Sequence, residues 1–479
     1  MTGTFRLALA RMNPRMAEPE ANAARLRALR LRAASLGADL VLAPEHSLSG
    51  AVPAELAADP AFAAALGVAL DGLAAEPGPP LILGAPWREG DRLREGLHLL
   101  EGGAVRTRRA AHELRPGFDP GPVPGPLGFG EIRLGLMAGR DWRGPMVAET
   151  LAETGAEILL AADSLPVETG GEERVLQSAL ARVVENGLPL VLLNRLGAEG
   201  ESAHDGSALV LNADRAPALR ARPFEEGVIL TEWVRDGASW RCLPVLAPAP
   251  MPEAERIWRA LLLALRDHAA RHAPAGILLP LERGADAALL AALAAEAFPA
   301  ADLRPLLMEG EAAPLARNLG LPARAPDLAP AAAALSAALG LREDVALRHL
   351  RRLALDALAE AEGLLPLVAG PSEVPSAFAP LWHLSPALRR DLAAWRGIHS
   401  PAGAEGVPAA PERLPPAAVA PGPPLPAPAQ SLTPWQSLAR KDYKRRHLPP
   451  GLNLAPRAFG PRASGQDRRD TETEDEPAP

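Results

Sequence analysis

Lysine is almost absent from this chain of 479 residues. The only lysines are Lys441 and Lys444, so arginine carries nearly all of the positive charge. This absence excludes Schiff-base chemistry and a phosphate-loop lysine from the residues before 441. Cys242 is the single cysteine, which excludes an intramolecular disulfide and any zinc or iron–sulfur site built from several cysteines.

The chain is also poor in aromatic residues and carries no excess of positive charge. Aromatic residues make up 4%, and the 48% hydrophobic fraction consists mostly of alanine and leucine, which favours helices. A net charge of −8 gives no basic field for binding nucleic acid. Every apolar run is shorter than the roughly 20 residues of a membrane span, and the N-terminus lacks the pattern of a signal peptide. We therefore expect a cytoplasmic protein that binds neither nucleic acid nor membrane.

Short apolar runs alternate with helical patterns through the first half of the chain. Apolar runs between turn signals predict buried strands, and a 3.6-residue apolar spacing predicts helices. The predicted strands lie at 5–12, 38–45, 80–84, 131–138, 157–161, 189–194 and 207–212, and the predicted helices at 20–36, 146–154 and 172–186. The alternation indicates a layered α/β domain over residues 1–245, followed by the linker-like stretch LAPAPMPE at 246–253.

A second unit is predicted over residues 255–400. It opens with a helix at 253–272, and residues 275–298 then form a strand, a turn and a helix, the order that begins many parallel-sheet nucleotide-binding domains. His268 and His272 are spaced four residues apart on the first helix, which we interpret as a solvated face rather than a metal pair. Residues 401–479 contain a Pro/Ala-rich spacer and an acidic tail.

Several segments resemble those of one enzyme family. The stretches GADLVLAPEHSLSG, RLGLMAGRDW, ARVVENGLPLVLLNRLG and HDGSALVLNAD resemble the glutamine-amidase domain of glutamine-dependent NAD synthetases, which belongs to the nitrilase, or carbon–nitrogen hydrolase, superfamily. Further along, ILLPLERGADAALLAAL is similar to the family's ATP-pyrophosphatase loop, AGPSE to its Gly-Asn-Lys-Ser-Glu motif, and KDYKRRHLPPGLNLAPRAFG to its C-terminal segment.

The resemblance implies a fold and a reaction. The fold is a nitrilase-like α-β-β-α sandwich for residues 1–245, followed by a reduced doubly wound, Rossmann-like α/β domain for residues 255–400. The family reaction is ATP-dependent and magnesium-dependent amidation of deamido-NAD, a ligase activity that uses ammonia released from glutamine.

The amidase site of the family uses a Glu-Lys-Cys constellation. A thiolate attacks the amide carbon, a carboxylate takes the thiol proton, and a positive charge stabilises the oxyanion. Glu45 occupies the position of the base, Ala111 the position of the lysine, and Gly139 the position of the cysteine. Cys242 lies far from Glu45 in the sequence, so we interpret it as a structural thiol. Glu45 itself is either a buried structural carboxylate or a retained pocket residue.

The phosphate-binding loop of the family is altered in the same way. Small residues allow its backbone N–H groups to approach a polyphosphate. The corresponding residues here are Glu282, Arg283, Gly284, Asp286 and Ala287. A carboxylate at 282 repels a polyphosphate, and Arg283 adds bulk where the family has glycine.

In the downstream motif of the family, proline replaces the lysine at position 371 and leaves Ser372 and Glu373. Asp286 and Glu373 correspond to magnesium ligands in the family, but without the phosphate loop they form a weak metal site. We therefore expect no bound cofactor or metal.

Two hypotheses follow from these substitutions. The first is a homologue with both sites disabled that acts as a scaffold, a regulator or a small-molecule sensor, as a homo-oligomer or in complex with an active NAD synthetase. The second is an enzyme: a residual NAD synthetase, or a diverged carbon–nitrogen hydrolase built around Glu45.

Overall fold

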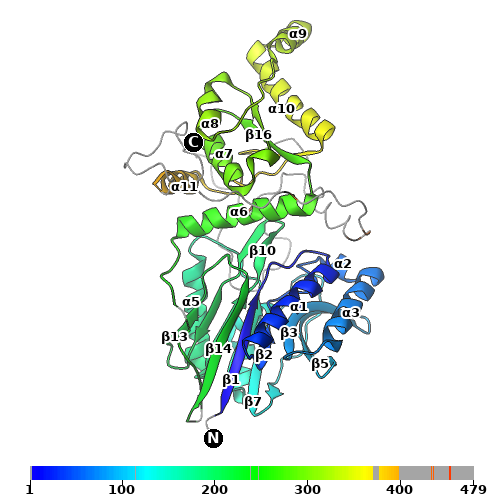
Figure 1. The fold of residues 1–479 in the computed structure, drawn as a ribbon, viewed down its shortest axis with the longest axis vertical. Helices are drawn as coiled ribbons and strands as arrows, with labels where there is room; N and C mark the ends of the chain where they lie inside the picture. The colour runs from blue at the N-terminus through cyan, green and yellow to red at the C-terminus, as the bar shows by residue number, and fades with distance from the viewer. Residues whose placement is uncertain are drawn as a thin grey trace, which may run out of the picture.

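The computed structural model contains two units stacked along its long axis, with helix α6 (Glu253–His272) at their junction (Figure 1). The structure describes residues 3–113, 115–237, 239–245, 247–370 and 377–398, together with Leu425, Thr433, Trp435 and Leu452–Leu454. Most of the predicted spacer and tail at 401–479 lies outside these residues, as do Ser372 and Glu373.

The first unit contains two large sheets. In the described residues the larger sheet has seven strands, in the order β15 (Ser239–Cys242), β14 (Gly227–Asp236), β1 (Thr4–Arg11), β2 (Leu40–Leu42), β3 (Leu81–Glu89), β4 (Arg92–Glu101) and β5 (Ala104–Ala110). Strands β1, β2 and β3 run parallel, and the other neighbours pair antiparallel.

The second sheet of this unit has six described strands. Their order is β13 (Pro217–Arg220), β12 (Ala208–Leu211), β9 (Leu190–Asn194), β8 (Ile158–Asp163), β7 (Ile132–Ala138) and β6 (Leu127–Phe129). The central strands β7, β8 and β9 run parallel, so their carboxyl ends meet at one edge of the sheet.

The two sheets pack face to face and helices cover their outer faces. The larger sheet is covered by α1 (Pro19–Ser35), α2 (Ala54–Ala57) and α3 (Pro60–Ala75), and the smaller by α4 (Pro145–Glu153) and α5 (Gly171–Asn186). Strand β1 shows how the sequence produces these layers. Leu7 and Leu9 enter the core between the sheets, whereas Ala8 and Ala10 face the helices, because successive residues of a strand point to opposite sides. The result is an α-β-β-α sandwich.

A β-hairpin of the first unit packs against α6. It consists of β10 (Leu196–Glu199) and β11 (Ser202–Asp205), which pair antiparallel. The buried carboxylate of Asp267 on α6 accepts hydrogen bonds from the backbone N–H of Ala198 at 2.7 Å and from Asn13 Nδ2 at 2.9 Å. These bonds fix the hairpin, and with it one end of the sandwich, against the junction helix.

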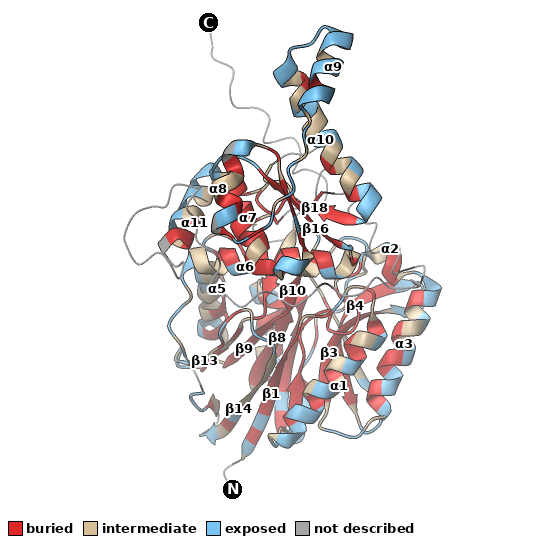
Figure 2. Ribbon diagram, turned by 45° about the horizontal axis from the view of Figure 1, so that its top comes forward, coloured by how far each residue is buried: buried red, intermediate tan, exposed pale blue. Residues whose placement is uncertain are grey.

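The second unit is built around a small parallel sheet. Its three described strands lie in the order β17 (Leu303–Leu307), β16 (Gly276–Leu281) and β18 (Leu364–Pro366). The helices of this unit are α7 (Ala285–Ala297), α8 (Ala313–Asn318), α9 (Ala329–Leu339), α10 (Glu343–Glu362) and α11 (Pro386–Ile398), with 3₁₀ turns at η2 (Ala300–Asp302) and η3 (Gly310–Ala312). Figure 2 shows α9 largely exposed at the end of the molecule farthest from the sandwich.

A short described segment near the C-terminus returns to the junction. Leu452 and Leu454 are buried in the same core as α6 and β16. The N–H of Asn453 donates to the carbonyl of Glu201 at 2.8 Å, and the N–H of Thr169 donates to the carbonyl of Leu454 at 3.1 Å. This segment therefore contacts both units.

The structure differs from the sequence expectations in several places. The apolar patterns did not predict α3, β4 or β5. The expectation of a solvated helix face at His268 is wrong: the ring is buried and stacks between His272, at 4.1 Å, and Phe378, at 4.4 Å. Among the described residues, no helix combines the length and apolar character needed to cross a membrane.

Candidate functional site

Four strand ends converge on one cavity of about 400 Å³ in the first unit. Glu45 follows β2, Ala111 follows β5, Gly139 follows β7, and Asp163 is the last residue of β8. Glu45, Ala111 and Asp163 line the cavity, and Gly139 lies behind the Glu45 carboxylate. The structure thus brings together the three positions that the sequence assigned to the amidase site.

The turn that carries Glu45 is held against β3 at Gly84. A side chain at Gly84 would place its Cβ 2.4 Å from the backbone nitrogen of His46, so only glycine permits this approach. The Gly84 N–H donates to Ser47 Oγ at 3.0 Å, and the Gly84 carbonyl accepts from the N–H of Leu48 at 3.1 Å. These contacts hold Glu45 at the floor of the cavity.

Gly139 forms the turn between β7 and the short helix η1 (Gly139–Trp142). Its φ angle is +55°, a conformation that favours glycine. A Cβ at this position would stand 2.5 Å from Oε1 of Glu45. The Glu45 carboxylate therefore occupies the space that a cysteine side chain at residue 139 would need.

The Glu45 carboxyl is buried and its pKa is raised to about 8. Loss of solvation is the largest cause, and the negative charges of Asp163 and Glu95 add to it. The positive charge of Arg115 opposes the rise, and the Ser164 hydroxyl acts in the same direction to a smaller extent. Glu45 is mostly protonated at pH 7, so it is a poor acceptor for a thiol proton there.

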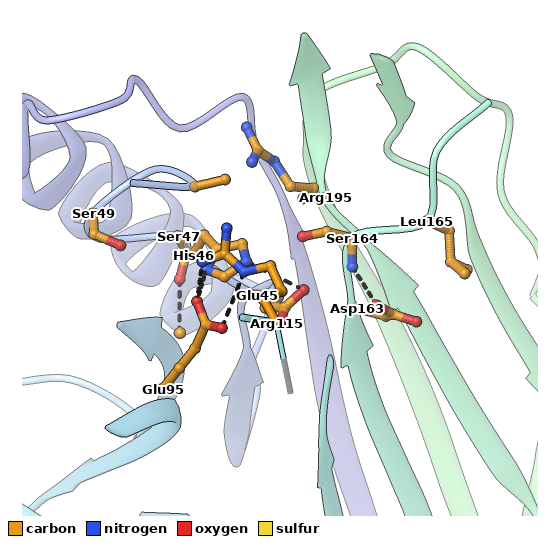
Figure 3. Close-up of polar contacts among 12 residues, drawn as sticks. Glu45, His46, Ser47, Ser49, Glu95, Arg115, Asp163, Ser164, Leu165 and Arg195 are labelled. Carbon is orange, nitrogen blue, oxygen red and sulfur yellow. Dashed lines mark hydrogen bonds and ion pairs between the residues drawn. The ribbon is translucent and has the colours of Figure 1, made fainter. Parts of the chain in front are cut away.

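A second buried carboxylate, Glu95, lies on β4 beside Glu45. His46 links the two: its Nε2 is 3.4 Å from Glu45 Oε2 and its Nδ1 is 3.1 Å from Glu95 Oε1. Arg115 forms a two-pronged ion pair with Glu95, with Nε 3.1 Å from Oε2. Burial, with the neighbouring positive charge of Arg115, lowers the pKa of His46 well below its usual value, so the imidazole is neutral. Figure 3 shows these side chains converging from one side of the cavity.

These three side chains are poorly suited to a metal ion. One ligand atom from each of Glu45, His46 and Glu95 lies within 4.8 Å of the others. However, Glu95 is already neutralised by Arg115, whose positive charge repels a cation, and Glu45 is mostly protonated.

The opposite wall of the cavity is fixed by Asp163. Its carboxylate accepts from Trp142 Nε1 at 2.7 Å and from two nitrogens of Arg143 at 3.0 Å. Ser164 follows it, and its buried hydroxyl lies beside the Glu45 carboxyl, whose pKa it helps to lower. Figure 3 shows Asp163 and Ser164 at the end of β8, across from Glu45.

Cys242 does not line this cavity and, among the described residues, forms no hydrogen bond with its catalytic positions. It lies on the edge strand β15, fully buried in the core between the sheets. Burial raises the pKa of its thiol to about 12. Its backbone pairs with the Asn212 side chain at 2.8 and 3.0 Å. The thiol is therefore a packing group in the structure, and it does not line the cavity.

The altered phosphate loop lies in the second unit between β16 and α7. Glu282 and Gly370 line a cavity of about 490 Å³, and Gly284, with φ +112°, precedes α7. Burial raises the pKa of Glu282, and the nearby Glu309 carboxylate adds to the effect. Glu309 accepts from the backbone N–H of Arg283 at 3.1 Å, so a carboxylate already occupies a donor that would face a phosphate.

Asp286, at the start of α7, is engaged by the chain itself. Its Oδ2 lies 2.6 Å from Arg389 Nη1 on α11. Ala287 is buried in the first turn of the same helix. A magnesium ion would have to displace the arginine, and a polyphosphate would meet Glu282 and Glu309. The residues present do not fit the ATP and magnesium that the family uses.

Comparisons with known proteins agree with this architecture. Residues 6–241 match the carbon-nitrogen hydrolase family. The chain is 34% identical over 339 residues to the glutamine-dependent NAD(+) synthetase of Rhodobacter capsulatus. The chain is a homologue of glutamine-dependent NAD(+) synthetases and has a carbon-nitrogen hydrolase domain. A second synthetase relative, from Synechocystis sp., is 25% identical over 417 residues, which cover 76% of this chain and 74% of that protein.

The match to the R. capsulatus synthetase covers 67% of this chain but only 61% of that protein, which is less than two thirds of its length. Among solved structures, the glutamine-dependent NAD+ synthetase from Acinetobacter baumannii in complex with ADP aligns with a TM-score of 0.80. The alignment covers 95% of this chain and 97% of that chain at 19% identity. The predicted fold, a nitrilase-like sandwich with an NAD-synthetase-like α/β unit, is confirmed.

Sequence reasoning missed Glu95 and Arg115, although both contact the predicted site. Glu95 lies inside β4, a strand that the patterns did not predict, and Arg115 is one of many arginines in the chain. One signal was available. Glu95 and Gly96 stand just before the apolar residues LHLL, so a carboxylate occupies a position where a strand would normally bury an apolar side chain.

Proposed function

We propose that this homologue of glutamine-dependent NAD(+) synthetases is disabled at both catalytic sites and acts as a scaffold or regulator. The contact between the Glu45 carboxylate and the position of a side chain at Gly139 carries the proposal. An amidase of this type needs a nucleophile at that position, and here the base of the reaction takes its place.

The other groups of the cavity support the same function. Ala111 supplies no charge for an oxyanion, and the guanidinium of Arg115 is held by Glu95 rather than left free. In the second unit, Glu282 and Glu309 oppose a polyphosphate, and Asp286 is paired with Arg389. According to this proposal, the chain uses neither ATP nor magnesium.

Scaffolding is the role that remains when the fold is kept and the reacting groups are lost. We infer that the chain assembles as a homo-oligomer or with an active NAD synthetase from the same cell. Light scattering after size exclusion, for the chain alone and mixed with that synthetase, tests this part. A strictly monomeric chain that never co-elutes with the synthetase overturns it.

The test of catalysis uses the purified full chain with deamido-NAD, ATP, magnesium and either glutamine or ammonia. We expect no NAD and no glutamate, while the R. capsulatus synthetase assayed in parallel serves as the positive control. Turnover that disappears in Asp286→Ala or in Glu45→Gln contradicts the proposal.

A hydrolase built on Ser164 is a second candidate. The Ser164 Oγ faces the cavity beside Glu45 and interacts with the Glu45 carboxyl, the group that would take its proton. In this reaction Oγ attacks an amide carbon, its proton passes to the Glu45 carboxylate, and the amine leaves with that proton; water then cleaves the acyl-serine. The rate should rise through pH 8, where Glu45 ionises, and vanish in Ser164→Ala. A flat pH profile, or activity retained in Ser164→Ala, excludes this candidate.

A further inference from the structure

Arg140 lines the cavity beside Glu45, directly after Gly139. In the part of the chain that the structure describes, its side chain makes no hydrogen bond and no ion pair. The two other arginines of the cavity wall are held by carboxylates: Arg115 pairs with Glu95, and Arg143 pairs with the carboxylate at the end of β8. Arg140 therefore brings to the cavity a positive charge that no described side chain neutralises by contact.

The residues that follow Arg140 hold its backbone in place. Asp141 accepts hydrogen bonds from the backbone N–H groups of His112 and Glu113, both at 2.8 Å. Trp142 is tied to the end of β8 through its Nε1. The Arg140 side chain thus starts from a fixed turn, and a ligand that binds it does not have to order the backbone.

The guanidinium of Arg140 is within reach of a ligand. The residue is only partly buried. None of its side-chain nitrogens is among the buried atoms that lack a hydrogen-bond partner. Since the side chain has no partner in the described residues, each of these nitrogens lies at the accessible surface.

The surroundings of this guanidinium are charged. Burial lowers the pKa of Arg140, and the positive charge of Arg143 adds to this effect, while the negative charges of Asp163 and Glu45 oppose it. An arginine nevertheless stays protonated at neutral pH. An anion that reached the guanidinium would offset the cost of its partial desolvation.

The acidic side chains of the cavity wall are mostly neutralised already. Glu168 pairs with Arg174 and Glu199 with Arg195, both at 2.9 Å. Glu45 is mostly protonated at pH 7. These carboxyl groups therefore add little repulsion against a single negative charge near Arg140.

A second negative charge on the ligand is disfavoured. Glu113 also lines the cavity, forms no ion pair with Arg140, and has its carboxylate beside Gly144 at the start of α4. A dianion would meet repulsion from Glu113 and from Asp163, whereas one negative charge balances the one charge of Arg140. The planar fork of a guanidinium also donates two parallel hydrogen bonds to the two oxygens of a carboxylate.

We propose that the cavity beside Glu45 binds a monocarboxylate, whose two oxygens accept hydrogen bonds from the guanidinium of Arg140. This inference rests on the proposed function, because a cavity without a nucleophile at Gly139 holds its ligand without converting it. The carboxylate is then the signal that a regulator of this kind detects.

Three small probes test the proposal on the full chain at pH 7: propionate, its uncharged isostere propionamide, and sulfate, which is a dianion. Saturation-transfer NMR and calorimetry should show propionate binding at least about tenfold more tightly than propionamide, because only propionate forms charge-assisted hydrogen bonds with the guanidinium. Sulfate, added as a competitor, should displace propionate only at a higher concentration than unlabelled propionate does.

Variants of Arg140 locate the site. Arg140→Gln removes the charge and should weaken propionate binding at least about tenfold. Arg140→Lys keeps the charge but loses the planar fork, and should weaken binding by about threefold or more. Arg88→Gln, at an exposed arginine of β3 outside the cavity wall, is the matched control and should bind as the native chain does.

Each alternative outcome is decisive. Equal binding of propionate and propionamide, tighter binding of sulfate, or unchanged propionate affinity in Arg140→Gln overturns the proposal. If Arg140→Gln does not fold, unchanged affinity in Arg140→Lys overturns it. The same samples are assayed for hydrolysis of propionamide. Such hydrolysis contradicts the proposed function, while the binding data still decide whether Arg140 holds a carboxylate.

Discussion

Oε1 of Glu45 lies 2.5 Å from the point where the Cβ of a side chain at Gly139 would stand. In a working amidase these two positions must cooperate, one holding the base and the other the nucleophile. Here they compete for the same space. A side chain at residue 139 therefore requires the Glu45 carboxylate, the far end of a flexible side chain, to move.

Gly139→Ala tests this competition, with Gly130→Ala as a matched control. Both glycines have nearly the same φ, +55° and +56°, but a Cβ at Gly130 meets no atom within 4 Å. The control should lose about 1 kcal/mol of stability through backbone strain alone. Gly139→Ala should lose at least about 1 kcal/mol more, because the Glu45 carboxylate must move. Urea unfolding measures both, and equal losses would show that Glu45 moves without cost.

Stability should depend on pH through Glu45. Its folded pKa of about 8 is higher than the value in an unfolded chain, so the folded state binds more protons between about pH 4.5 and pH 8. The free energy of unfolding therefore falls as pH rises through this window, by up to about 1.4 kcal/mol per pH unit, and is level above it. Glu45→Gln should remove this slope and be more stable than the native chain at pH 8. Glu149→Gln, on the exposed surface of α4, should leave the slope unchanged.

The ion pair between Arg115 and Glu95 should be strongly coupled. Glu95 is buried and Arg115 is partly open to the cavity, so Arg115→Met leaves an unpaired buried carboxylate and should cost about 2 kcal/mol. The double variant Arg115→Met/Glu95→Gln should recover at least half of that loss. Thermal unfolding of the four proteins in this cycle measures the coupling. Additive losses would show that the two side chains stabilise the fold independently.

Removing the negative charge at the altered phosphate loop should restore affinity for polyphosphate. Glu282→Gln keeps the size of the side chain and lowers repulsion at the N-terminus of α7. Calorimetry with inorganic triphosphate should show at least tenfold tighter binding than for the native chain. The exposed substitution Glu149→Gln serves again as the control. Equal binding by all three proteins would show that the charge of Glu282 does not cause the loss of phosphate binding, which would then be assigned to Glu309 and to the bulk of Arg283.

The resemblance to the glutamine-amidase domain located the amidase positions, and apolar runs predicted the strands before Glu45 and Gly139 but not the strand before Ala111. Glu45, Ala111 and Gly139 each stand one to three residues beyond a strand, and parallel strand ends meet in space. The partners of these residues could not be found in the same way. Arg115 reaches Glu95 from a loop 20 residues away, a contact fixed by tertiary packing that leaves no periodic signal.

The same limit explains the wrong expectation at His268. Its spacing from His272 is that of a surface pair on a helix, but α6 is buried along much of its length between the two units. A helix pattern describes one element, whereas burial depends on what the rest of the chain places against it.

Leu452 and Leu454 are buried in the core at the junction, although they follow every described strand and helix in the sequence. During synthesis on the ribosome, every described strand and helix emerges before these two leucines do. The junction therefore remains incompletely packed until residues 452–454 have been synthesised. A truncation after α11, chosen to simplify expression, would leave α6 with an open apolar surface and make the protein prone to aggregation.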